Sequence, residues 1–397
     1  MHIELGVKLS IKGIAELPLH EGSVPRWLFN RMVKLANAII TVFVNEFGED
    51  KFLERLANPL WFQAFSNVLG FDWHSSGSTT VVCGVLRQAL NKSEVEIAIA
   101  GGKGKKSLET PIEVKQAAIK LDLGEEYGEK LARISRLVAK IDNAALQDGY
   151  SIYHHSMIVS KSGSWTVIQQ GMNVEKRMAR RYHWLSSKVR KFVEDPHNAI
   201  VDVKISESTL NLVARESRSC RNTILEIINH GPAKLKRDLG SIKRFLRKNY
   251  PITRWFSGKN ELAVKLDYYK PIEEIAINWR ALRNVFQVKP EDFESFLLFR
   301  GIGPSTLRAL ALISELIYDE PPSKKDPITH IFDPIKWSFA VGGKDGIPYP
   351  INRKVYDSVV YELEQIISDM RVGSKEKLFA FKRLKSISER WSVNLRS

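Results

Sequence analysis

The sequence predicts an α+β protein, with a mixed α/β N-terminal lobe at residues 1–198 and a mainly helical C-terminal lobe at residues 199–397. The first observation is strand periodicity: residues 3–11 alternate apolar and polar side chains, and residues 150–172 read as two strands joined by a tight turn, a β-hairpin. The second is helical spacing, because apolar residues recur every three or four positions from about residue 200 onward. We place the boundary where residues 195–198, Asp-Pro-His-Asn, interrupt the pattern.

The remaining elements of the N-terminal lobe also follow from local patterns. Residues 24–70 carry apolar side chains at spacings of three and four, which predicts helices packed against a core. Residues 95–100 read as a strand that runs into the glycine-rich loop 101–106. The apolar positions of residues 131–141 predict an amphipathic helix, which ends before a turn at Asp-Gly 148–149.

Charge and cysteine content restrict the function classes. The 60 Lys and Arg residues exceed the 45 Asp and Glu residues, so the net charge is +15, which suits a polyanion such as nucleic acid; the alternative is a solvated basic surface without a partner. Cys83 and Cys220 are far apart, which excludes a disulfide framework or a cysteine-based zinc site. We find neither a signal-like N-terminus nor a membrane-spanning apolar stretch, so we expect a cytoplasmic protein without a membrane partner.

The sharpest motif lies near residues 291–314, where an apolar helix is predicted to end at Gly301-Ile302-Gly303 and a second helix to begin at Pro304. The two glycines permit positive φ and a close backbone approach, and free amides at the start of a helix attract phosphate. This resembles the helix-hairpin-helix of DNA repair and recombination proteins, which grips the sugar-phosphate backbone. The alternative is an ordinary helical hairpin with a glycine turn. The predicted contacts are Gly301, Gly303, Ser305 and Thr306.

The same motif occurs in base-excision glycosylases, whose pattern this sequence matches only in part. Some of these enzymes carry a lysine in the hairpin and an aspartate further along, just before a Thr-His pair. Here Ser305 stands in place of the lysine, Ile328 in place of the acid, and Asp326 is displaced from that position. A Schiff-base lyase is therefore not expected, and a glycosylase remains an alternative.

Two further basic regions are candidates for nucleic-acid contact. Residues 176–191 hold seven Lys and Arg residues and no acid, interleaved with Tyr182, His183 and Trp184. This pattern suggests that the basic residues, Arg180 and Arg181 among them, neutralise phosphates while the aromatic side chains stack on bases. The alternative is a solvated helix whose aromatic residues pack inward. A second basic run covers residues 234–248.

Two glycine-rich segments could hold phosphate through backbone amides and lysines: residues 101–106 with Lys103 and Lys105, and residues 342–346 with Lys344. Neither matches a Walker A loop, so ATP binding has little support.

Acidic residues and histidines gather between the predicted helix and hairpin. Asp142 and Asp148 could hold a divalent ion, Mg²⁺ or Mn²⁺, that activates water for phosphodiester cleavage. His154 and His155 point to opposite faces of a strand, so at most one joins the site, and we select His154. The predicted catalytic residues are thus Asp142, Asp148 and His154, with the two aspartates as metal ligands. The alternative is that these residues only cap the helix and pack the hairpin.

Several short segments resemble a prokaryotic family of domains of unknown function, the one numbered seven hundred and sixty-three. The resemblance implies an archaeal or bacterial cytosolic protein, with a DNA-repair or recombination setting inferred from the hairpin. We therefore predict a DNA-binding protein, most simply a metal-dependent endonuclease. The alternatives are a base-excision glycosylase and a non-enzymatic DNA-binding module. The matching segments are residues 17–22, 73–77, 101–105, 153–155, 169–172 and 342–346.

Overall fold

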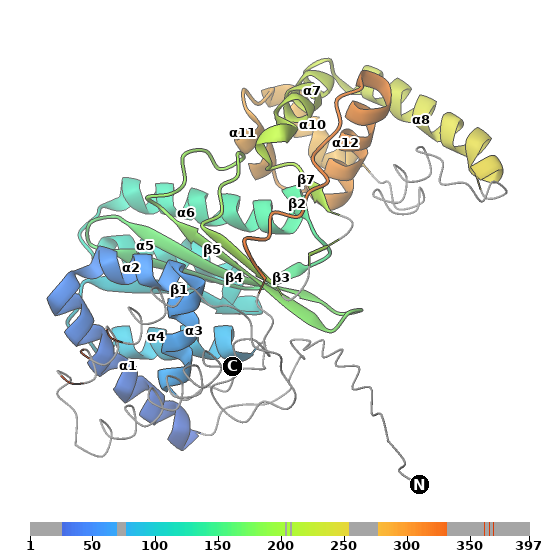
Figure 1. Ribbon diagram of the computed structural model, residues 1–397. Helices are drawn as coiled ribbons and strands as arrows, with labels where there is room; N and C mark the ends of the chain where they lie inside the picture. Colours follow the sequence, from blue (N-terminus) through green and yellow to red (C-terminus); the bar gives the residue numbers. More distant parts are fainter. Residues whose placement is uncertain are drawn as a thin grey trace, which may run out of the picture.

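A computed structural model provides the structure of the chain (Figure 1). The predicted strand at residues 3–11 and the second glycine-rich segment with Lys344 lie outside the described residues. The structure describes residues 26–69, 77–202, 205–206, 209–253 and 277–331, with residues 361, 365 and 368.

A six-stranded sheet forms the centre of the molecule. Its first four pairings are antiparallel, and the last, between β6 and β8, is parallel. The predicted hairpin at residues 150–172 is confirmed as β3 and β4, which pair around a turn at residues 161–164. The strands lie in the order β1 (Ile97–Lys103), β3 (Ser151–Ser160), β4 (Trp165–Asn173), β5 (Met178–Leu185), β6 (Ala199–Asp202) and β8 (His330–Ile331).

Helices cover both faces of the sheet (Figure 1). Neighbouring residues of a strand point to opposite faces, so Ile158 and Ile168 join one core, while Met157 and Val167 join the other. The first core is built with α1 (Arg26–Phe47), α2 (Glu49–Ala57), α3 (Pro59–Leu69) and α4 (Gly77–Leu90). The second is built with α5 (Lys105–Lys120), α6 (Glu125–Lys140) and the π-helical turn η1 (Ile141–Ala145).

A mainly helical lobe is inserted between β6 and β8 (Figure 1). The sheet therefore takes its last two strands from beyond residue 198, and its edge does not coincide with the predicted lobe boundary. The α+β class is confirmed. The lobe contains η2 (Arg215–Ser217), α7 (Arg218–Asn229), α8 (Pro232–Thr253), α10 (Trp279–Val288), α11 (Phe293–Leu298) and α12 (Pro304–Tyr318), and a short ladder joins β2 (Leu146–Gln147) to β7 (Leu210–Asn211).

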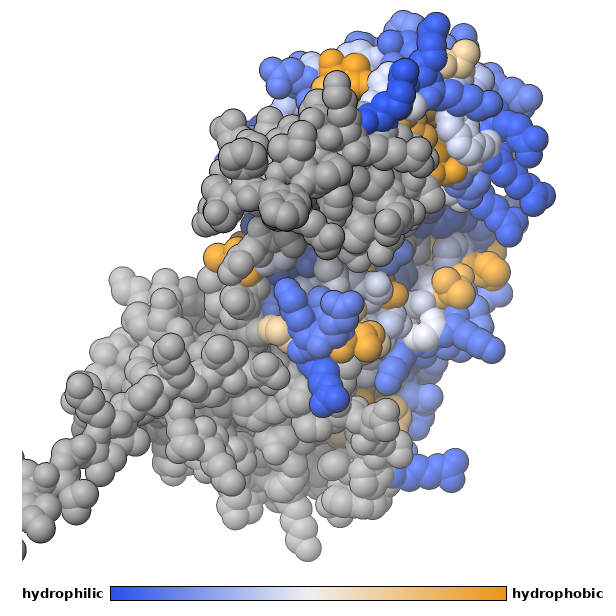
Figure 2. Space-filling view, turned by 90° about the vertical axis from the view of Figure 1, so that its right-hand side faces the viewer, coloured by the Kyte–Doolittle hydropathy of each residue, from blue (hydrophilic) through white to orange (hydrophobic). Residues whose placement is uncertain are grey.

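Figure 2 shows one face of the molecule, on which part of the described surface is visible. Hydrophilic residues predominate on the face shown in Figure 2, including its upper part, where the helical lobe lies. Among the described residues, we find no helix with the length and apolar character needed to traverse a bilayer.

Candidate functional site: the glycine bend and the buried polar networks

The segment that joins α11 to α12, residues 299–303, is called the glycine bend below. Gly301 is exposed and has φ +88°, and a Cβ there would lie 2.8 Å from the Cβ of Ala281. Both the backbone conformation and the close packing therefore require glycine at this position. Gly303 has an extended backbone, φ −130°, and a Cβ there would meet no atom within 4 Å. The prediction that the bend uses positive φ is thus right for Gly301 and wrong for Gly303.

Backbone amides at the start of α12 are free to bind a ligand. Leu307 donates its N–H to the carbonyl of Gly303 at 3.1 Å, and Pro304 has no N–H. The amides of Gly303, Ser305 and Thr306 have no acceptor within the part of the chain that the structure describes, and no side chain caps α12. Gly303 and Ser305 are only half-buried. The bend therefore presents unpaired donors at the positive end of a helix dipole.

Side chains from other elements donate hydrogen bonds to carbonyl groups of the bend and of Pro304, which follows it. Lys140, at the end of α6, donates to the carbonyl of Ile302, and burial lowers the pKa of this lysine. Gln147 donates to the carbonyl of Pro304 at 3.1 Å, and Asn278 donates to the carbonyl of Gly301 at 3.2 Å. These bonds fix the orientation of the bend, so its amides do not need to reorganise before they bind an anion.

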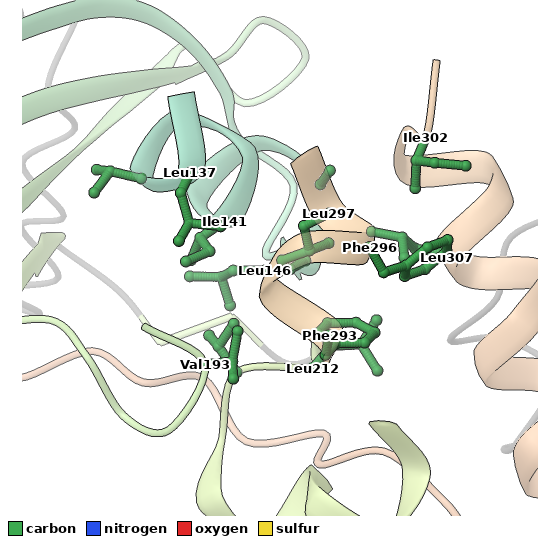
Figure 3. Packing of buried hydrophobic residues seen from close by; sticks show 14 of the residues in the cluster. Leu137, Ile141, Leu146, Val193, Leu212, Phe293, Phe296, Leu297, Ile302 and Leu307 are labelled. Carbon is green, nitrogen blue, oxygen red and sulfur yellow. The ribbon is translucent and has the colours of Figure 1, made fainter. Parts of the chain in front are cut away.

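Apolar packing anchors the bend from below. Figure 3 shows Ile302 beside Phe296 and Leu307, with Leu297 facing Ile141 of the π-helical turn. Ile302, Phe296, Leu297 and Leu307 have no exposed surface. Ile302 therefore anchors the otherwise exposed bend in the core that joins the helical lobe to the sheet.

Positive charge surrounds the glycine bend. Arg300 is exposed within the bend, and Arg280 and Arg283 are exposed on α10, whose N-cap Asn278 contacts the bend. Within the described ranges none of these arginines forms an ion pair, so their charge is not neutralised locally. The predicted contact Thr306 is buried, and its hydroxyl accepts a hydrogen bond from the amide of Asn278 at 3.1 Å.

Asp142 lies in a buried hydrogen-bonded chain on the sheet face that carries α5 and α6. Its carboxylate accepts hydrogen bonds from the side chains of Gln169, Trp184 (2.8 Å) and His197. Gln169 in turn accepts from Nδ1 of His155 at 2.8 Å, and burial lowers the pKa of His155. Both carboxylate oxygens of Asp142 are therefore already used by protein donors.

Asp148 belongs to a second buried network, centred on Arg180. Its carboxylate accepts from the Tyr182 hydroxyl at 2.7 Å and from Arg180 at 2.9 Å. Arg180 also donates to Asp202 at 2.7 Å and to both oxygens of Asp326 at 2.8 Å. Burial raises the pKa of Asp148 although the charge of Arg180 opposes this shift.

The surroundings of Arg180 change the interpretation of the basic run at residues 176–191. Residues 178–185 form β5 and not a helix, and Arg180, Tyr182 and Trp184 lie on one face of it with no exposed surface. The stretch lacks acids in the sequence because its acidic partners come from other elements. Arg180, fully buried among three carboxylates, is not available to a phosphate group, so its predicted contact with nucleic acid is wrong.

His154 and Arg181 lie on the opposite face of the sheet, which α1 to α4 cover. His154 pairs in register with Gln170, and Gln170 with Arg181. Both predicted residues are buried, so Arg181 is not an external DNA contact either.

Asp142, Asp148 and His154 thus occupy three different surroundings. Over the described ranges, no three His, Cys, Asp or Glu side chains are arranged to hold a metal ion, so the predicted metal site is not assembled by Asp142 and Asp148.

The first glycine-rich segment is largely a strand and not a loop. Gly101 and Lys103 belong to β1 and pair with β3, and only Gly104 precedes α5. The amide of Gly101 donates to Glu113 at 2.7 Å, so a protein carboxylate already occupies the position predicted for a phosphate. Lys103 and Lys105 are exposed, and their predicted role as DNA contacts stays a prediction.

Sequence reasoning missed several residues of these networks. The local pattern singles out neither Asp202 nor His197, and it marks Asp326 only as a displaced glycosylase acid. One signal was present: Arg180, Tyr182 and Trp184 alternate with period two, which favours a strand with one polar-aromatic face.

The fold and these sites define an α+β protein in which a mainly helical lobe, carrying the glycine bend, is inserted into a six-stranded sheet. The chain belongs to the family described as protein of unknown function (DUF763), whose model matches residues 13–351. Comparisons with the curated proteins and with the solved structures gave no match.

The buried histidines predict a loss of stability in acid. Burial lowers the pKa of His154 to about 3 and holds the pKa of His183 well below its ordinary value of 6.5. On acidification the unfolded chain therefore takes up protons before the folded one does. The free energy by which these neutral, buried histidines stabilise the folded state is fully present above pH 6.5 and is lost progressively as the pH falls toward 3. A tenfold difference in proton affinity between the two states corresponds to about 1.4 kcal/mol. We therefore expect His154 alone to lower the free energy of unfolding by a few kcal/mol between pH 7 and pH 4.

Urea unfolding at several pH values measures this effect. The His154→Asn variant should show a shallower dependence of unfolding free energy on pH than the wild type, since it lacks one of the titrating groups. Identical slopes for the two proteins between pH 7 and pH 4 would show that His154 does not contribute.

Proposed function

We propose that this protein binds the sugar-phosphate backbone of DNA through the glycine bend. The observation that carries the proposal is the pair of half-exposed amides, Gly303 and Ser305, which lack acceptors in the described structure while the neighbouring carbonyls are held by other side chains. A phosphate oxygen would accept both N–H groups at the positive end of the 15-residue helix α12. The net charge of +15 and the resemblance to helix-hairpin-helix proteins support the same function.

Such binding does not depend on base sequence. Backbone amides and the exposed Arg300 contact phosphates and sugars, which are the same at every step of the strand. The proposed complex is therefore sensitive to salt and tolerant of sequence. A setting in DNA repair or recombination is part of the same proposal.

Metal-dependent cleavage of the bound strand remains a prediction with less support. Asp142 and Asp148 already accept hydrogen bonds from protein donors, and they belong to separate networks. A Mg²⁺ or Mn²⁺ centre would therefore require other residues. DNA binding without an assigned reaction is the function that the geometry supports best, and base excision stays an alternative.

The Gly303→Val variant tests the binding function. Extended backbone accommodates valine and no atom lies near the new Cβ, so the fold should persist while the added methyl groups cover the free amides. We expect fluorescence anisotropy with labelled duplex and single-stranded oligonucleotides to show at least about tenfold weaker binding, since each hydrogen bond to a charged group contributes about 1.5–3 kcal/mol. Gly240→Val is the matched control, because a Cβ at Gly240 also meets no atom within 4 Å. Equal affinity of folded Gly303→Val and wild type would remove the bend from the proposal.

The same oligonucleotides, incubated with and without Mg²⁺ or Mn²⁺, test for a reaction. Intact strands support a binding module. Metal-dependent breaks that disappear in Asp142→Asn and Asp148→Asn would favour the endonuclease against the geometry described above. Abasic sites formed without metal would favour the glycosylase.

A further inference from the structure

Two adjacent arginines of β5 have opposite surroundings. Arg180 lies among three carboxylates on one face of the sheet. Arg181, on the other face, is 8% exposed, and within the part of the chain that the structure describes it forms no ion pair. Among the described residues, its guanidinium contacts neutral groups: it donates to the hydroxyl of Thr79 at 3.3 Å and to the side-chain oxygen of Gln63 at 3.5 Å, and it lies 4.7 Å from the ring centre of Phe62.

The charge of Arg181 affects its neighbours. Burial lowers the pKa of Arg181 to about 10 and raises that of the nearby Cys83 thiol to about 12, so the thiol is neutral and does not offset the arginine. Burial, followed by the charge of Arg181, lowers the pKa of His183. A buried guanidinium without a counter-charge is unfavourable by several kcal/mol, so a compensating anion is expected beside it.

Unpartnered polar atoms lie next to Arg181 in the same register row. Residues that pair with one another on neighbouring strands form this row: His154 of β3 pairs with Gln170 of β4, and Gln170 pairs with Arg181 of β5. At the other end of the row, His154 pairs with the exposed Lys103 of β1. Nδ1 of His154 and Nε of Arg181, which can donate, and Oε1 of Gln170, which accepts, are buried and have no hydrogen-bond partner among the residues that the structure describes. Buried polar groups are almost always satisfied, so three orphans in one row indicate that a ligand completes them.

The first turn of α4 lies against the same row. Thr79, which accepts from Arg181, is 2% exposed and follows Gly77 and Ser78 at the start of this 14-residue helix. The positive end of the helix dipole thus adds to the charge of Arg181. The planar guanidinium fork suits an oxyanion with several oxygens, and phosphate has the charge and the acceptor number that these donors require.

We propose that Arg181, His154, Gln170 and Thr79 form a buried binding site for a phosphate group. In this site the guanidinium and the Thr79 hydroxyl donate to phosphate oxygens. The imidazole of His154 supplies a further neutral donor when its proton is on Nδ1. Gln170 lies between the two in the row, and its Oε1 accepts a hydrogen bond from a protonated oxygen of the phosphate monoanion. No residue of the glycine bend takes part, so this site is independent of the proposed DNA contact.

Thermal unfolding with inorganic phosphate tests the site at a constant ionic strength maintained with sodium chloride. We expect phosphate to raise the unfolding midpoint of the wild type in a saturable manner, by about 5 °C at a hundredfold excess over Kd. Arg181→Met should lose this response, and its midpoint without phosphate should be no lower than that of the phosphate-free wild type, because the substitution removes an uncompensated charge. Arg237→Met, which removes an exposed arginine of α8, is the matched control and should keep the response.

Each other outcome overturns the proposal. If phosphate leaves the unfolding midpoint of the wild type unchanged, and Arg181→Met unfolds at a lower temperature than the wild type, the chain itself supplies the counter-charge. An equal response in the wild type and Arg181→Met would place phosphate elsewhere. If Arg181→Met does not fold, Thr79→Val and Gln170→Leu replace it, and each should weaken phosphate binding at least about threefold; unchanged binding would contradict the site. A nucleoside monophosphate, tested in parallel, distinguishes a phosphate ester from the free ion.

Discussion

Replacement of Arg180 by methionine is expected to lower the free energy of unfolding by about 3–5 kcal/mol or more, because it leaves buried carboxylates without their counter-charge. Asp148, Asp202 and Asp326 each contact the guanidinium and have no exposed side-chain surface. Burial already raises the pKa of Asp148 with the arginine in place. Without it, the three acids would repel one another in a medium of low dielectric constant.

Urea unfolding of Arg180→Met at pH 7 measures this loss, with Arg237→Met as the exposed control that should change stability by less than about 0.5 kcal/mol. A pH series adds a specific signature. Acid protonates the unpaired carboxylates, so the deficit of the variant relative to the wild type should shrink as the pH falls toward 5. A deficit below about 1 kcal/mol, or one independent of pH, would show that Arg180 does not neutralise these acids.

The second large effect is expected for Gly101→Ala. The new Cβ would lie 2.2 Å from the backbone oxygen of His155 and 2.3 Å from the hydroxyl of Thr110, and the backbone has φ +89°. The substitution forces β1 away from β3 and from α5, which costs about 1–3 kcal/mol for overpacking, in addition to about 1–2 kcal/mol for the left-handed backbone. We expect a total loss of about 2–5 kcal/mol.

Gly104→Ala separates these two contributions. Gly104 also has a positive φ, +60°, but a Cβ there meets no atom within 4 Å. This variant should lose only the conformational part, about 1–2 kcal/mol, in the same denaturation measurement. Equal losses for Gly101→Ala and Gly104→Ala would contradict the role of close packing at Gly101.

Glycine at position 101 illustrates how a local motif can mislead. The run Gly-Gly-Lys-Gly-Lys suggested a phosphate loop, since glycines free backbone amides for a ligand. In the structure the amide of Gly101 binds Glu113, and the missing Cβ makes room for β3. A short glycine run serves either purpose, and only the neighbouring elements distinguish them.

Local patterns in the chain were sufficient for part of the secondary structure. The alternation within residues 150–172 identified the β3–β4 hairpin, and the spacing of apolar residues identified α6 and the helices α1 to α3 within residues 24–70, but not α4 or α5. Gly301-Ile302-Gly303-Pro304 identified a bend followed by a helix that begins with proline. These features depend on the periodicity of apolar residues, on the backbone freedom of glycine and on the absent N–H group of proline. All three are properties of a few consecutive residues.

The assignment of charged residues to sites needed the tertiary structure. Arg180 and Arg181 are neighbours in a basic run, yet strand alternation sends them to opposite faces, one against carboxylates and one against neutral groups. The partner Asp326 lies 146 residues from Arg180 along the chain, and nothing in its local sequence indicates the contact. The sequence by itself determined the β3–β4 hairpin, helix α6, the bend before α12 and the excess of positive charge. The tertiary structure decided which charges are buried and paired, because the free energy of a buried charge depends on the groups that packing brings within a few ångströms of it.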